Sequence, residues 1–194
     1  MTAVTEILRE PSGGALLAAF RAVRAHTETL AAPLSAEDCI IQSMPDASPV
    51  KWHLAHSSWF FESLILDQDT GYVPFDSHFA FLFNSYYEAL GPRHPRARRG
   101  LLTRPALDKV MAYRRHVDAA MESLLLRLDD DALAARIRLG LHHEQQHQEL
   151  ILTDIKHAFF CNPLLPAYAR QPPPPQASQA REWLAHPGGI ADRP

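Results

Sequence analysis

Cysteine is scarce in this chain, and so are the signals that direct a protein into or across a membrane. The two cysteines, Cys39 and Cys161, are far apart and fit no zinc or redox spacing. No apolar run approaches the length of a membrane span. The first residues lack the basic segment and apolar run of a signal peptide. We therefore expect two ordinary thiols in a reducing compartment, a cytoplasmic location and no membrane partner.

An excess of one charge is also missing. The formal net charge is −3 and the sequence pI is about 6.4. This balance gives no electrostatic reason to expect nucleic acid as a partner. The hydrophobic fraction of 46% is enough for a buried core, and 194 residues fit one domain with a tail.

No segment shows a convincing strand alternation, whereas helical periodicity recurs. Helices are predicted over residues 15–30, 35–42, 48–66, 105–128 and 131–160. The pattern predicts an all-α four-helix bundle with one long connection, between the second and third long helices. Within that connection, residues 78–90 suggest a short helix and residues 91–100 a loop.

Local signals set the predicted ends of the helices. Ser35 is expected to cap the brief helix, and Ser48 followed by Pro49 to begin the second long one. Asp129–Asp131 suit the start of the last helix, and Asn162-Pro163 its end. We expect residues 1–162 to form the bundle. The proline-rich composition predicts a linker and the first part of a further domain over residues 163–194.

The strongest chemical signal is a pair of histidines, His143 and His147, four residues apart on the last helix. Such side chains project from one face about one turn apart, so two imidazoles can share a metal ion. Leu139, Leu150 and Asp154 fall on the same stripe, which indicates that the pair faces the bundle interior. His142 lies about 100° away and is expected to be exposed.

A third histidine is predicted from the second long helix. His56 shares a stripe with Trp52 and Trp59, which should face the interior. His53 is the alternative, on the neighbouring stripe with Phe60. Three neutral nitrogen ligands with open positions suit zinc, iron, nickel or copper.

Residues 143–147, His-Glu-Gln-Gln-His, also match the HExxH pattern of zinc proteases. That match makes a zinc protease an alternative. Against it, Glu144 falls on a different face from the histidine pair. No sheet is evident, and the third ligand would come from upstream.

A basic segment contains Arg93, His94, Arg96, Arg98 and Arg99, followed by Arg104. It can be a solvated loop or an anion clamp. Arginine forks recognise carboxylates bidentately, so a small molecule that carries carboxylates could dock there.

Four stretches together resemble a known family. They are SPVKWHLAHSSWFFESLIL, LFNSYYEALGPRHPRARRGLLTRP, YRRHVDAAM and HHEQQHQELILTDIKH. Over residues 15–190 the chain is similar to the N-terminal domain of EgtB-type ergothioneine-biosynthesis sulfoxide synthases (hercynine oxygenases), which are non-haem iron enzymes. The resemblance implies a DinB-like four-helix bundle that binds iron(II) through His56, His143 and His147. It also implies that Gln146 faces the substrate imidazole and that Arg96 and Arg99 hold carboxylates of the thiol substrate.

The reaction implied by the resemblance uses oxygen. It joins the sulfur of γ-glutamylcysteine or cysteine to C2 of trimethylated histidine (hercynine) and gives a sulfoxide. Family members continue into a domain similar to the formylglycine-generating enzyme, which supplies a catalytic tyrosine. REWLAHPGGI resembles the start of that domain, so we expect it in a longer or separate chain, and the activity of this chain alone stays open. The alternatives are a stand-alone DinB-like metal-dependent thiol transferase and a non-catalytic helical binding module.

Overall fold

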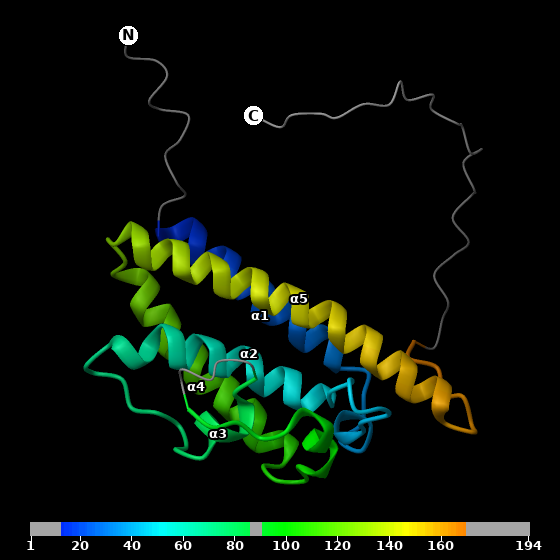
Figure 1. Cartoon of the computed structure of the whole chain (residues 1–194). Coiled ribbons are helices and arrows are strands. Elements are labelled where there is room, and N and C mark those ends of the chain that lie inside the picture. The colour runs from blue at the N-terminus through cyan, green and yellow to red at the C-terminus, as the bar shows by residue number, and fades with distance from the viewer. Residues whose placement is uncertain (1–12, 86–90, 170–194) are drawn as a thin grey trace, which may run out of the picture.

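Four long helices form the body of the protein in the computed structural model, which describes residues 13–85 and 91–169. They are α1 (Gly13–Ala31), α2 (Val50–Leu64), α4 (Leu107–Leu126) and α5 (Asp131–Cys161) (Figure 1). Shorter elements connect them: η1 (Asp38–Ile40), η2 (Leu66–Gln68), α3 (Phe79–Phe83) and η4 (Arg96–Leu101). The described residues contain no strand, and the predicted all-α bundle is confirmed.

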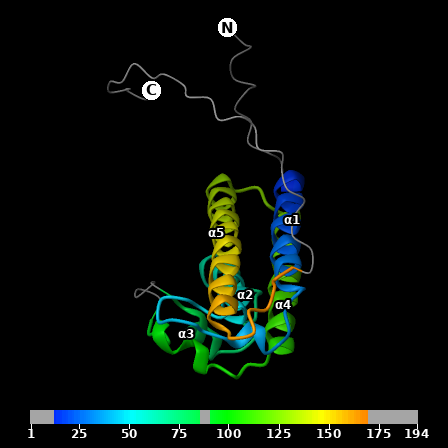
Figure 2. The ribbon, with the colours of Figure 1, turned by 90° about the vertical axis from the view of Figure 1, so that its right-hand side faces the viewer.

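Helix α2 is the central element of the bundle. It contacts all three other long helices as well as α3, and every residue from Val50 to Glu62 is buried. The turned view shows α1 and α4 on one side of the molecule and α5 on the other (Figure 2). Since α2 is buried all round, its histidines lie in the interior whatever their helical phase.

The predicted ends of α5 are confirmed to within one residue. Asp130 caps its start, because the carboxylate accepts hydrogen bonds from the amides of Ala132 (2.8 Å) and Leu133 (3.2 Å). The helix ends at Cys161, just before the predicted Asn162-Pro163 stop.

Three local predictions need correction. Residues 35–42 form only one 3₁₀ turn, in which Ser35 and Asp38 each accept the other's amide hydrogen. The Ser48 side chain does not cap α2; its hydroxyl accepts a hydrogen bond from Arg99 instead. The basic segment predicted as a loop contains the 3₁₀ helix η4.

Helices α2 and α5 approach closely where Gly140 faces Phe61. A Cβ atom added at Gly140 would lie 2.6 Å from Cε1 of the Phe61 ring, which is completely buried. Any larger residue here must displace a core aromatic ring. This contact sets the spacing of the two helices one turn before His143.

A buried charge network joins α5 to α1 and α4. The Glu144 carboxylate pairs with Arg24 (3.0 Å) and Arg114 (3.1 Å) and accepts a hydrogen bond from the Thr27 hydroxyl (2.7 Å). Burial raises the pKa of Glu144, but the two guanidinium groups outweigh it and lower the pKa to about 2. Glu144 is therefore a structural anion of the bundle core.

A second buried carboxylate, Glu62 on α2, joins the connection between α2 and α4 to the core. It accepts hydrogen bonds from the Tyr113 hydroxyl (2.5 Å), the Tyr72 hydroxyl and the Phe75 amide (3.3 Å). These three donors satisfy a buried polar group that would be costly to leave without partners.

Within the described residues, no helix is long and apolar enough to cross a membrane. The described chain leaves α5 through residues 162–169, where the Tyr168 hydroxyl donates to the carbonyl of Leu30 at the end of α1. Most of the predicted linker and further-domain segment, residues 170–194, lies outside the described part of the chain, as do residues 86–90.

Candidate metal centre

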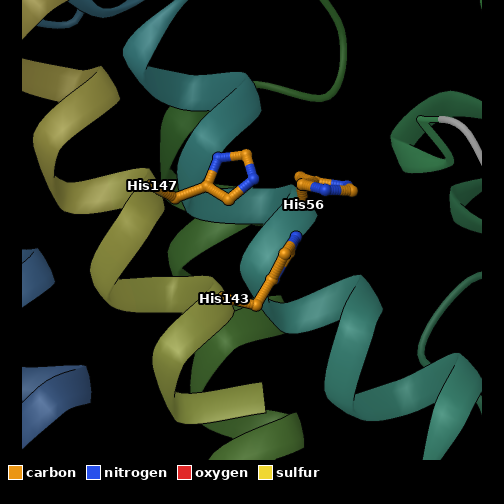
Figure 3. A group of neighbouring side chains, drawn as sticks. All are labelled: His56, His143 and His147. Carbon is orange, nitrogen blue, oxygen red and sulfur yellow. The ribbon is translucent and has the colours of Figure 1, made fainter. Parts of the chain in front are cut away.

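His56 from α2 and the pair His143 and His147 from α5 converge on one point (Figure 3). One ring nitrogen from each residue lies within 4.8 Å of the corresponding nitrogens of the other two. The ring centroids are 5.0 Å apart for His56 and His143, 4.7 Å for His56 and His147, and 4.5 Å for the α5 pair. Three nitrogen donors this close could hold a metal ion.

Aromatic rings and a carbonyl fix the orientation of His56. Its imidazole lies between Trp52 (centroids 4.4 Å apart, planes inclined by 15°) and Trp59 (5.3 Å, 14°). The Nδ1 atom donates to the carbonyl of Phe83, the last residue of α3, at 2.6 Å. With Nδ1 engaged, the lone pair of Nε2 is the one available to a metal.

The three histidines are neutral near pH 7 because burial opposes a charge on them. Burial, reinforced by the neighbouring histidines, lowers the pKa of His56 and of His147 well below 6.5. It also lowers the pKa of His143, to about 4. Neutral imidazoles carry the lone pairs that metal ligation requires.

The Nδ1 atom of His143 is buried and has no hydrogen-bond partner among the described residues. A buried unpaired polar nitrogen is costly in a folded protein, and a nearby cation would stabilise its ring. The donor set therefore fits a metal ion. Phe60 stacks on the His143 ring at 4.2 Å and holds it against α2.

The histidines line a cavity of about 550 Å³ that also contains the predicted substrate-binding residues. Its wall includes Gln146, Arg96 and Arg99, with Ser48 and Ser85 beside them. The guanidinium of Arg99 is buried, lies 3.3 Å over the Trp52 ring, and donates to Ser48 (2.9 Å) and Ser85 (3.2 Å). The other predicted basic residues, Arg93, His94, Arg98 and Arg104, do not line this cavity.

The face of α5 needs one correction. Leu139, predicted to share the inward face of the histidine pair, is 60% exposed. Side chains four residues apart are rotated by about 40° around the helix, so the direction changes from Leu139 through His143 to His147. Leu139 therefore lies on the solvent side of α5, whereas Glu144 faces the core. His143 and His147 lie on the flank between these directions and face the cavity. His142 is exposed, as predicted.

The geometry also bears on the zinc-protease interpretation of HExxH. Glu144 is completely buried and engaged by two arginines, and it does not line the cavity. It cannot act as a general base on a metal-bound water from that position. Arg24 and Arg114 were not found as its partners from the sequence, although each interrupts an otherwise apolar helix face.

Comparison with known proteins agrees with this architecture. Residues 19–157, which span α1 to α5 and all three histidines, match the family model of the DinB superfamily. The chain belongs to the DinB superfamily. DinB superfamily proteins are often metal-dependent enzymes, in keeping with the histidine cluster found here. A search of curated proteins finds no match to the chain.

Proposed function

We propose that this DinB-like bundle is the iron(II)-binding domain of an oxygen-dependent sulfoxide synthase that acts in ergothioneine biosynthesis. The observation that carries the proposal is a cluster of three neutral histidines in a cavity whose wall also holds two arginines. Three of the four sequence stretches that resemble EgtB-type enzymes contribute these same residues. The resemblance supplies the choice of iron, since the donor set alone also suits other transition metals.

Three nitrogen ligands suit a reaction with several reactants. They leave coordination positions open, and neutral ligands preserve the charge that lowers the pKa of a nearby thiol. When bound, iron(II) would supply the redox chemistry that activates oxygen. Overall, a thiol S–H and the C2–H of hercynine are lost, a C–S bond and an S=O bond form, and one O₂ is reduced to the sulfoxide oxygen and one water. No further reductant is required.

The residues of this chain would bind and orient the substrates. Arg99 is held rigidly by Trp52 and two serines, so its charge is fixed in the wall for a substrate carboxylate. Arg96, more exposed on the same wall, would bind a second carboxylate. Gln146, one residue before His147, would hydrogen-bond to the hercynine imidazole.

The proposed enzyme has a second part. We propose that residues 163–194 are a linker and the first part of a domain similar to the formylglycine-generating enzyme, in this or a separate chain. Such a domain would complete the cavity and contribute the catalytic tyrosine.

Cobalt(II) in place of iron gives a test that does not require turnover. Cysteine or γ-glutamylcysteine added to the cobalt-loaded chain should produce a sulfur-to-cobalt charge-transfer band, and Arg99→Met should weaken the response to thiols that carry carboxylates. A matched thiol without carboxylates, such as ethanethiol, should respond equally in both proteins. Absence of any thiol-induced band would contradict the proposal.

A second function from another enzyme class follows from the family match, which covers only the helical bundle. A stand-alone DinB-like thiol transferase would conjugate a thiol to an electrophile without oxygen. Mass spectrometry of products formed with zinc, compared with oxygen-dependent sulfoxide formed with iron and hercynine, separates the two. A metal-free binding module would give neither product and would bind no metal.

A further inference from the structure

Next to His147, a further histidine of the cavity wall, His53, forms a hydrogen-bonded row with Asp154. The Nδ1 atoms of His147 and His53 are 2.8 Å apart, and Nε2 of His53 is 3.0 Å from the Asp154 carboxylate. The same carboxylate oxygen accepts the amide hydrogen of Ser48 at 2.8 Å. His53, His147 and Asp154 are all buried.

The proton positions in this row follow from its two ends. Asp154 can only accept, so Nε2 of His53 carries a hydrogen. One hydrogen lies between the two Nδ1 atoms, and it belongs to one of the two rings. If it belonged to His53, that ring would be a cation in the interior, and Nε2 of neutral His147 would carry a hydrogen and no lone pair. A hydrogen on His147 leaves both rings neutral and frees its Nε2 lone pair.

We propose that His53 and Asp154 are positioning residues that hold His147 as its Nδ1–H tautomer and so present its Nε2 lone pair to the metal. The inference rests on the metal site proposed above. It assigns to His53 a role different from that of a ligand, because both of its ring nitrogens are already engaged. Burial, the largest influence, lowers the pKa of both histidines, which agrees with two neutral rings.

The three ligands are thereby fixed in different ways. The Phe83 carbonyl holds Nδ1 of His56, and the His53–Asp154 row holds Nδ1 of His147. Nδ1 of His143 has no partner among the described residues. The structure therefore predicts defined tautomers for His53, His56 and His147, whereas nothing comparable selects one for His143.

The tautomers can be observed directly in the full chain without metal. Long-range ¹H–¹⁵N correlation spectra distinguish an imidazole protonated on Nδ1 from one protonated on Nε2. We expect His147 to be protonated on Nδ1 and His53 on Nε2. Protonation of His147 on Nε2, or averaging between its two tautomers, would overturn the proposal even if the chain binds metal.

Two variants of His53 then measure how much the hydrogen-bonded row contributes to metal affinity. His53→Phe keeps a planar ring and removes both hydrogen bonds, so the affinity for cobalt(II) or zinc(II) should fall by about 10- to 100-fold with one metal still bound per chain. His53→Gln offers an amide oxygen to His147 and an amide N–H to Asp154, and should recover most of the affinity. The exposed His142→Gln is the matched control and should bind as the wild type does.

Circular dichroism shows whether each variant folds. If His53→Phe does not fold, the ¹H–¹⁵N correlation spectra of the wild-type chain still test the proposal. Unchanged affinity in His53→Phe would overturn the positioning role. An equal loss in the Phe and Gln variants would overturn its hydrogen-bond basis. A wild-type chain that binds no metal refutes the proposed function instead, and leaves the tautomer measurement as a separate result.

Discussion

Replacing Glu144 by glutamine tests whether this residue of the HExxH pattern is a structural anion or a catalytic base. The carboxylate is completely buried between Arg24 and Arg114, and Glu144→Gln would leave both guanidinium groups facing a neutral amide. Removing one partner of a buried ion pair costs about 3–5 kcal/mol. The lowered pKa of Glu144 gives a second value for this stability contribution, because a shift from 4.5 to about 2 in the folded state contributes about 3 kcal/mol at neutral pH.

The assay is urea and thermal denaturation at pH 7, both monitored by circular dichroism, with Glu149→Gln on the exposed side of α5 as control. For a chain of this size, a loss of 3–5 kcal/mol lowers Tm by about 6–20 °C. The pKa of Glu144 is lowered in the folded state, so its contribution is present above about pH 4.5 and is lost as pH falls towards 2. The stability difference between wild type and Glu144→Gln should narrow over that interval.

Two results would refute this reasoning. One is a Glu144→Gln variant as stable as the Glu149→Gln control. The other is a stability difference that does not change between pH 4.5 and pH 3, since the carboxylate would then not be held by its ion pairs.

Three other predictions concern packing, hydrogen bonding and pH. Gly140→Ala places a Cβ 2.6 Å from an aromatic carbon of α2 and should cost about 1–3 kcal/mol and weaken metal binding, whereas Gly14→Ala, with open space around it, should do neither. Tyr113→Phe removes a donor from the buried Glu62 carboxylate and should lower the free energy of unfolding by about 1–3 kcal/mol, measured by urea denaturation. Because burial lowers the pKa of His143 from 6.5 to about 4, the metal-free chain should lose stability as pH falls through that interval, and a flat profile would contradict the burial of this ring.

The sequence predicted most of the fold because local signals define these helices. An aspartate cap and an Asn-Pro stop bound α5 within one residue of its observed ends. In the connection from Leu64 to Leu107 the sequence predicted less, since its short 3₁₀ turns depend on contacts with α2 and carry little periodicity.

The three histidines were predicted from phase and resemblance, but their surroundings were not. Helical phase favoured His56 over His53 on the assumption that α2 has one buried and one exposed face. Helix α2 has no exposed face, so phase could not distinguish the two histidines. His53 lies in the interior as well and meets Asp154 across about a hundred residues of sequence. Likewise, the pairing of Glu144 with Arg24 joins helices whose spatial relation no local pattern specifies.

The central claim is that His56, His143 and His147 hold one iron(II) ion. It is tested most directly by anaerobic equilibrium binding of iron(II) to the wild type, His143→Ala, His147→Ala and the exposed control His142→Ala. We expect about one equivalent per chain for the wild type and the control, with binding lost in the other two. Full metal binding by both His143→Ala and His147→Ala would contradict it.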